Sequence, residues 1–187
     1  GSGREMAERV YTSRLLGSDK RLVLHGGGNT SFKTIAEDLL GERHEVLRVK
    51  GSGWDMAALD PAGLPAVRLD PWRRLRARDA LGDEDMVRVL RASLIDPGAP
   101  NPSVETLLHA FLPATCVDHV HADAICSLAN APDPAAAVLD ALGPGVAVVD
   151  YIRPGFELSK RVAELADARA VVLAHHGLVT WGETGEE

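Results

Sequence analysis

The chain has 187 residues, a formal net charge of −7 and a hydrophobic fraction of 45%, which favours one globular domain and argues against general binding to the phosphate backbone of nucleic acids. Its longest apolar runs, 135–139 and 170–174, are far shorter than the roughly 20 residues of a membrane span, and we expect no signal peptide, because the first residues do not combine basic residues with an apolar stretch. The two cysteines and the lack of a CxxC motif exclude a disulfide scaffold and a cysteine zinc cluster, so we expect a cytoplasmic protein.

Helical and strand patterns alternate along the chain, which predicts an α/β fold layered around a central sheet. Asp83, Ser103 and Asp133 are the expected N-caps of three helices. The order of the strands is left open. In chain order the patterns predict a helix at 4–16 ended by Gly17, strands at 21–25 and 45–50, helices at 83–94 and 106–112, a strand at 117–121, a short alanine-rich helix after Asp133, a strand at 146–150, a helix at 157–168 and a strand at 170–174.

Two glycine-rich turns follow predicted strands, at 26–31 (GGGNTS) and at 51–53 (GSG). Turns of this kind can direct backbone N–H groups and hydroxyls at an anion, although a tight turn without a ligand is an equally open interpretation. Neither turn contains the Walker A pattern or GxGxxG. The turns therefore favour a small phosphorylated metabolite over a nucleotide.

Histidines form the most informative pattern. His119 and His121 are two residues apart on a predicted strand, so both imidazoles leave the same face and can reach one metal ion. The alternative is that one packs in the core while the other makes a hydrogen bond. His175 and His176 are adjacent and point in opposite directions, so at most one of them is expected to join the pair. Three histidines would leave a fourth coordination position open, as in catalytic zinc sites.

Glu105 and His109 are four residues apart on a predicted helix and share one face. Such pairs are often solvated, but the neighbouring residues 104, 107, 108, 110 and 111 are apolar. A carboxylate beside a metal is suited to moving a proton next to a carbonyl group. We therefore expect Glu105 to be an acid/base residue.

The end of the chain predicts a helix that is only beginning. Thr184 and Glu187 have the spacing of a capping box, the pattern of a helix N-terminus. We expect the chain to be a fragment of a longer polypeptide; a disordered acidic tail is the alternative.

Six sequence blocks, taken in order, resemble one family: the class II aldolase/adducin head domain, and within it the aldolase part of bifunctional rhamnulose-1-phosphate aldolase/short-chain dehydrogenase proteins. The likeness identifies 4–187 as one domain of this type, truncated at its C-terminal end. The blocks are HGGGNTS (25–31), KGSGWD (50–55), PSVETLLHA (102–110), HVHADA (119–124), YIRPGFEL (151–158) and HHGLVTWG (175–182).

The resemblance implies a three-layer α/β/α fold with a mainly antiparallel sheet. It also implies a homo-oligomer, a tetramer in the family, and a dehydrogenase domain fused to the full-length protein. By position, it implies Glu105 as acid/base, His119, His121 and His176 as ligands of a divalent metal, Zn²⁺ in the first place, and Gly28, Asn29, Ser52, Gly53 and Ser103 as phosphate-binding residues.

The implied reaction is cleavage of a ketose 1-phosphate, similar to rhamnulose 1-phosphate, to dihydroxyacetone phosphate and an aldehyde. Two alternatives stay open. One is a sugar-phosphate 4-epimerase that uses the same retro-aldol step, and the other is a non-catalytic, adducin-like interaction module.

Overall fold

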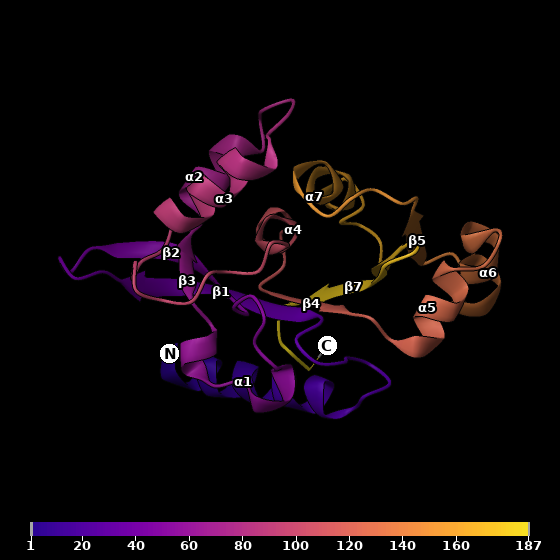
Figure 1. Ribbon diagram of the computed structural model, residues 1–187, viewed down its shortest axis with the longest axis horizontal. Coiled ribbons are helices and arrows are strands. Elements are labelled where there is room, and N and C mark those ends of the chain that lie inside the picture. The colour runs from indigo at the N-terminus through magenta and orange to yellow at the C-terminus, as the bar shows by residue number, and fades with distance from the viewer. Residues whose placement is uncertain (1, 187) are drawn as a thin grey trace.

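The computed structural model describes residues 2–186, which form a seven-stranded sheet with helices on both faces (Figure 1). The strand order is β3-β2-β1-β4-β7-β6-β5, and neighbouring strands are antiparallel except for β5 and β6. The expected α/β fold with a mainly antiparallel central sheet is therefore confirmed. The strands are β1 (Asn29–Glu37), β2 (Arg43–Val49), β3 (Ala66–Arg68), β4 (Cys116–Val120), β5 (Val146–Val149), β6 (Ala170–Leu173) and β7 (Gly177–Gly182).

Helices cover the sheet in two layers. In Figure 1, α1 lies below the sheet and α2, α3, α4 and α7 lie above it. No helix among residues 2–186 is long and apolar enough to span a bilayer. The helices are α1 (Ser2–Ser18), α2 (Asp70–Leu75), α3 (Asp83–Ala92), α4 (Thr106–Phe111), α5 (Asp123–Ala129), α6 (Pro134–Leu142) and α7 (Phe156–Ala163), with 3₁₀ turns at η1 (Met56–Ala58) and η2 (Pro61–Gly63).

Alternation along β4 decides which side chains face the site. Val117 belongs to the core between the sheet and helices α4 and α7, together with Leu108 and Leu158. Val120 belongs to the core on the opposite face, with Ala122. Because successive strand residues point to opposite faces, His119 lies on the same side as Val117 and so points toward α4.

Most predicted elements are present with shifted ends. The strands expected at 45–50, 117–121, 146–150 and 170–174 are β2, β4, β5 and β6, and the predicted helices correspond to α1, α3, α4, α6 and α7. Asp133 caps α6 by accepting a hydrogen bond from Ala136 N. Asp83 is instead the first residue of α3, after Gly82. The capping box at Thr184 involves Glu187, which lies outside the described residues.

The strand predicted at 21–25 is wrong. This segment is a chain of turns, with hydrogen bonds from Leu22 N and Val23 N to Asp19 O, and His25 has a positive φ of 52°. Its carbonyl oxygens at Leu22 and Arg21 accept from the backbone nitrogens of His121 and Asp123, just beyond β4, and Val23 is buried without joining a ladder. The strand begins instead at Asn29, in the segment expected to be a glycine-rich turn.

The close packing of α1 on η1 can be tested by a substitution at Gly17. A Cβ at Gly17 would lie 2.3 Å from the backbone nitrogen of Ala57. We expect Gly17→Ala to lower the free energy of unfolding by about 1–3 kcal/mol through this overlap, although alanine favours helix by about 1 kcal/mol. Gly3→Ala is the matched control, because nothing lies within 4 Å of that site on the same helix. Urea denaturation would measure both, and an unchanged or raised stability for Gly17→Ala would contradict the packing.

Candidate active site

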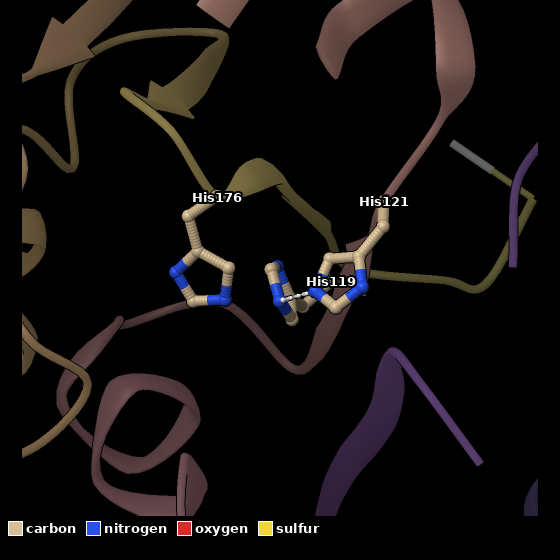
Figure 2. A group of neighbouring side chains, drawn as sticks. All are labelled: His119, His121 and His176. Carbon is tan, nitrogen blue, oxygen red and sulfur yellow. Dashed lines mark hydrogen bonds between the residues drawn. The ribbon is translucent and has the colours of Figure 1, made fainter. Parts of the chain in front are cut away.

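Three histidines from two parts of the sheet meet above it. His119 lies on β4, His121 directly follows that strand, and His176 lies in the turn between β6 and β7. One side-chain nitrogen of each lies within 4.8 Å of the others, and the ring centroids are 4.8, 4.8 and 5.3 Å apart (Figure 2). The structure thus brings His176, and not His175, to the pair that the strand spacing predicted.

The hydrogen bonds of His119 fix its tautomer. Its Nδ1 lies 3.0 Å from the carbonyl oxygen of Leu178, and because a carbonyl only accepts, Nδ1 carries the proton. Burial lowers the pKa of His119 to about 4, so the ring is neutral near pH 7. Nε2 therefore keeps its lone pair and accepts a 3.0 Å hydrogen bond from Nε2 of His121. A neutral imidazole with this orientation is the form that binds a metal.

The residues around His176 explain the HHG block. A Cβ at Gly177 would lie 2.5 Å from Val120 O and 2.9 Å from the His121 ring, so only glycine fits where β7 passes the histidines. His175 has a positive φ of 58°, and its exposed ring turns away to Asn130, with Nδ1 2.9 Å from Oδ1. The strained turn thus directs the two neighbouring histidines apart.

Glu105, directly before α4, borders the histidine cluster. Its Oε1 lies 3.2 Å from His176 Nε2, and its Oε2 lies 3.5 Å from His119 Nε2. Burial by itself raises the pKa of this carboxyl, but the contact with His176, the charges of His119 and His176 and the Asn29 amide together lower it below its ordinary value. With 9% of its surface exposed, Glu105 does not belong to a solvated surface pair.

Asn29 is held beside Glu105 by the sheet register. It pairs directly with His119 across β1 and β4, so both point toward α4. Its Nδ2 donates to Glu105 Oε2 at 2.7 Å and to Ser103 Oγ at 3.2 Å. His109 completes the group from α4, with Nε2 against Asn29 Oδ1 and Nδ1 2.7 Å from the hydroxyl of Ser31.

The expected phosphate-binding residues lie in three neighbouring segments. A Cβ at Gly26 would lie 3.1 Å from Gly53 O, so the two glycine-rich turns touch. Ser52 N donates to the carbonyl oxygen of Asn101, two residues before Ser103. Gly28 and Gly53 have positive φ values of 62° and 76°, a conformation that glycine adopts without strain. Ser52 and Gly53 are exposed, Gly28 is buried, and the Asn29 amide is engaged by Glu105, Ser103 and His109.

Lys50 is a site residue that the sequence did not single out. Only 2% exposed, its ammonium donates to Gly26 O at 3.0 Å and Trp54 O at 2.7 Å, with Gly51 O at 3.4 Å. Burial lowers the pKa of Lys50, while the charges of Asp55 and Glu105 oppose that shift. Lys50 thus joins the two glycine-rich turns. Its position directly before GSG was the available signal.

Two side-chain groups in the described range have metal-ligand spacing. The three histidines offer ring nitrogens, which first-row divalent ions accept readily, and beside them Glu105 Oε1 is buried without a well-aligned hydrogen bond. This donor set fits a divalent cation. The second group, Asp38, Glu42 and His44, is already satisfied internally, because Asp38 Oδ2 contacts both His44 Nε2 at 2.9 Å and Arg68 at 3.3 Å.

Solved structures share this fold. The N-terminal class II aldolase domain of a conserved protein from Thermoplasma acidophilum is 45% identical with a TM-score of 0.91, over 97% of this chain and 85% of that one. The L-fuculose-1-phosphate aldolase of Thermus thermophilus is 20% identical with a TM-score of 0.62, over 98% and 82%, and at that identity only the fold is shared. The chain therefore has a class II aldolase fold.

The sequence comparison defines the family. Residues 7–187 match the class II aldolase and adducin N-terminal domain, so the chain belongs to this family, and the expected membership of it is confirmed. The chain is also 48% identical over 183 residues to the uncharacterized oxidoreductase YuxG of Bacillus subtilis, covering 96% of this chain and 27% of that protein. It thus spans about a quarter of the length of this curated relative.

The buried histidines predict how stability depends on pH. Burial lowers the pKa of His109 to about 3 and that of His119 to about 4, against about 6.5 in an unfolded chain. Between pH 6.5 and 4 the unfolded chain binds more protons, so the free energy of unfolding falls as the pH falls. From pH 7 to 5 each histidine should remove about 2 kcal/mol.

Urea unfolding of the EDTA-treated protein at pH 7 and pH 5 measures this loss. His109→Gln should lose the part of the pH dependence that comes from His109, which is about half of the loss in unfolding free energy that His109 and His119 cause together. His25→Asn, at an exposed position with positive φ that asparagine tolerates, should keep all of it. A stability that does not change between pH 7 and 5 would contradict neutral, buried rings.

Proposed function

We propose that the protein is a divalent-metal-dependent aldolase that cleaves a ketose 1-phosphate, similar to rhamnulose 1-phosphate, to dihydroxyacetone phosphate and an aldehyde. Family membership supports an enzyme acting on sugar phosphates. The observation that carries the proposal is the contact between Glu105 and the histidines: its two carboxylate oxygens lie 3.2 and 3.5 Å from ring nitrogens of His176 and His119. An acid/base group thus borders a cluster suited to a cation.

His119, His121 and His176 would hold the cation, and we propose Zn²⁺, for which three histidines leave a position open to substrate. The bound cation would supply Lewis-acid polarisation of the substrate carbonyl. The carbonyl oxygen of Leu178 accepts from Nδ1 of His119 and so holds this ring with the lone pair of Nε2 toward His121 and His176. Gly177 lets the chain pass close enough for the three rings to converge.

Glu105 is the proposed proton carrier. Cleavage between C3 and C4 of a ketose 1-phosphate removes the proton of the C4 hydroxyl, leaves the bonding electron pair on C3 and makes C4 the aldehyde carbon. A proton delivered to C3 then completes dihydroxyacetone phosphate. Among the described residues, Glu105 is the carboxylate in contact with the histidine cluster, and burial excludes bulk water from competing for its proton.

The three neighbouring loop segments are the proposed phosphate site. Ser103 Oγ accepts from Asn29 Nδ2 and from the backbone nitrogen of Glu105, so its hydroxyl hydrogen is available for a phosphate oxygen. Ser52 and Gly53 are exposed on the adjoining turn, and Gly28 precedes β1. The Lys50 ammonium beneath these turns adds positive charge where an anion would sit.

Two substitutions separate metal binding from proton transfer. Glu105→Gln should keep the metal, because the histidines stay and glutamine can still accept from Asn29, but should lower kcat at least about a hundredfold. His119→Ala should lose both metal and turnover. His175→Asn is the matched control, since its ring points away and asparagine tolerates its positive φ; both properties should stay near those of the parent.

Metal content after dialysis and the rate of dihydroxyacetone phosphate release provide the readouts. Cleavage that continues undiminished in a chelated, metal-free sample would refute the mechanism. A Glu105→Gln variant with full turnover would remove the proposed role of the carboxylate.

Product analysis distinguishes the aldolase from the alternatives. We expect the metal-loaded protein to release equal amounts of dihydroxyacetone phosphate and aldehyde from a ketose 1-phosphate. Isomerised sugar phosphate without free aldehyde would support the 4-epimerase instead. A protein that binds no metal after supplementation, and changes no sugar phosphate, would support a non-catalytic interaction module.

Two features of the whole protein also stay proposals. We propose that 4–187 is the aldolase domain of a longer protein with a fused dehydrogenase. The proposal is supported by the resemblance and by the match to a relative named an oxidoreductase, of whose length the chain covers 27%. We also propose a homo-oligomer, as in the family. The mass of the natural gene product and sedimentation of that protein would test these proposals.

A further inference from the structure

A buried chain of hydrogen bonds runs from the sheet to the proposed proton carrier. It begins at the Ser31 hydroxyl, passes through the His109 ring and the Asn29 amide, and ends on Glu105 Oε2. His109 is 0% exposed and Asn29 is 3% exposed, so the middle of the chain is closed to solvent. Neither the family match nor the proposed mechanism assigns a role to His109.

The geometry of a helix over a strand makes this chain possible. Glu105 directly precedes α4, and His109 lies within it, four residues and roughly 6 Å further along the helix axis. Asn29 and Ser31 are two residues apart on one face of β1, roughly 7 Å along a strand. Because the two repeats nearly match, His109 reaches both strand residues while Glu105 meets Asn29.

The direction of every hydrogen bond in this chain follows from the Glu105 carboxylate, the acceptor at the end of the chain. An ionised carboxylate can only accept, so Asn29 must present its NH₂ group to Glu105 and its carbonyl oxygen to His109. His109 Nε2 therefore carries a proton, and Nδ1 of the neutral ring accepts from the Ser31 hydroxyl. Turning the Asn29 amide over would set its carbonyl oxygen against the carboxylate and its NH₂ group against the Nε2 proton, which are two repulsive contacts.

We infer that His109 is a positioning residue for Glu105: by donating from Nε2 to Asn29 Oδ1, it fixes the Asn29 amide so that Nδ2 holds Glu105 Oε2. This inference rests on the proposed function of Glu105. The hold on Oε2 fixes the carboxylate plane and leaves Oε1, 3.2 Å from His176, at the histidine cluster. His109 itself is fully buried between α4 and the β1 residues Asn29 and Ser31, so it presents no surface to a substrate.

His109→Asn and His109→Gln form a matched test. Glutamine places its amide near the former Nε2 and can donate to Asn29, whereas asparagine ends near the former Nδ1 and reaches only Ser31. We expect His109→Asn to lower kcat for the ketose 1-phosphate at least about tenfold, with KM changed less than threefold and metal content unchanged. His109→Gln should recover kcat to within about threefold of the parent. Equal losses in the two variants, or no loss in His109→Asn, would overturn the inference.

Crystal structures of the variants test the inference independently of whether the protein catalyses the proposed reaction. The contact between Asn29 Nδ2 and Glu105 Oε2 should persist in the parent and in His109→Gln and be lost in His109→Asn; a contact kept in His109→Asn overturns the inference. A parent that cleaves no ketose 1-phosphate refutes the proposed function alone, because the structures still report the position of Glu105.

A second variant serves if His109→Asn does not fold. Asn29→Asp has the same shape and keeps an acceptor for His109, but loses the donor to Glu105. It should also lower kcat at least about tenfold with metal content unchanged, and its crystal structure should show Glu105 Oε2 displaced from residue 29. Parent-like kcat together with an unmoved Glu105 in this variant would overturn the inference.

Discussion

The pairing of Asn29 with His119 across β1 and β4 is the contact on which the site depends. It sets one side chain of the histidine cluster and the partner of Glu105 opposite each other, both toward α4. A shift of β4 by one residue in this register would turn His119 to the α1 face and leave Asn29 facing α4. The apolar contacts of Val117 with Leu108 and Leu158 oppose such a shift, because it would remove Val117 from that core. Core packing and site geometry therefore specify the same register.

Sequence reasoning succeeded where a side-chain type and a local spacing together determine geometry. The two-residue repeat on a strand brought His119 and His121 to one point, and the four-residue helical repeat put Glu105 and His109 on one face. The antiparallel sheet came from the family resemblance and the strand order stayed open, because pairing between distant strands leaves no local spacing in the sequence. The sequence patterns alone therefore did not predict how distant segments of the chain pack against one another.

The failures have separate physical causes. Residues 21–25 contain the apolar pattern of a strand, but no strand pairs with that backbone, whose hydrogen bonds go to a turn at Asp19 and to the backbone nitrogens of His121 and Asp123. β1 was missed because its inward positions carry Asn29 and Ser31, polar side chains whose burial is satisfied by α4. Lys50 was missed because its partners are backbone carbonyls, which any sequence could supply. A site built from buried polar groups lacks the apolar rhythm that marks ordinary strands.

The buried ammonium of Lys50 has a consequence for how an anion would approach. The molecule as a whole carries a net charge of −7 and repels a sugar phosphate at long range, but dissolved ions screen that repulsion within about 10 Å at 0.1 M salt. Lys50, enclosed by carbonyl groups and shut off from solvent, is screened far less. Rising ionic strength would therefore weaken the repulsion more than the attraction, so capture of a phosphorylated substrate should tolerate salt better than at a site of exposed lysines.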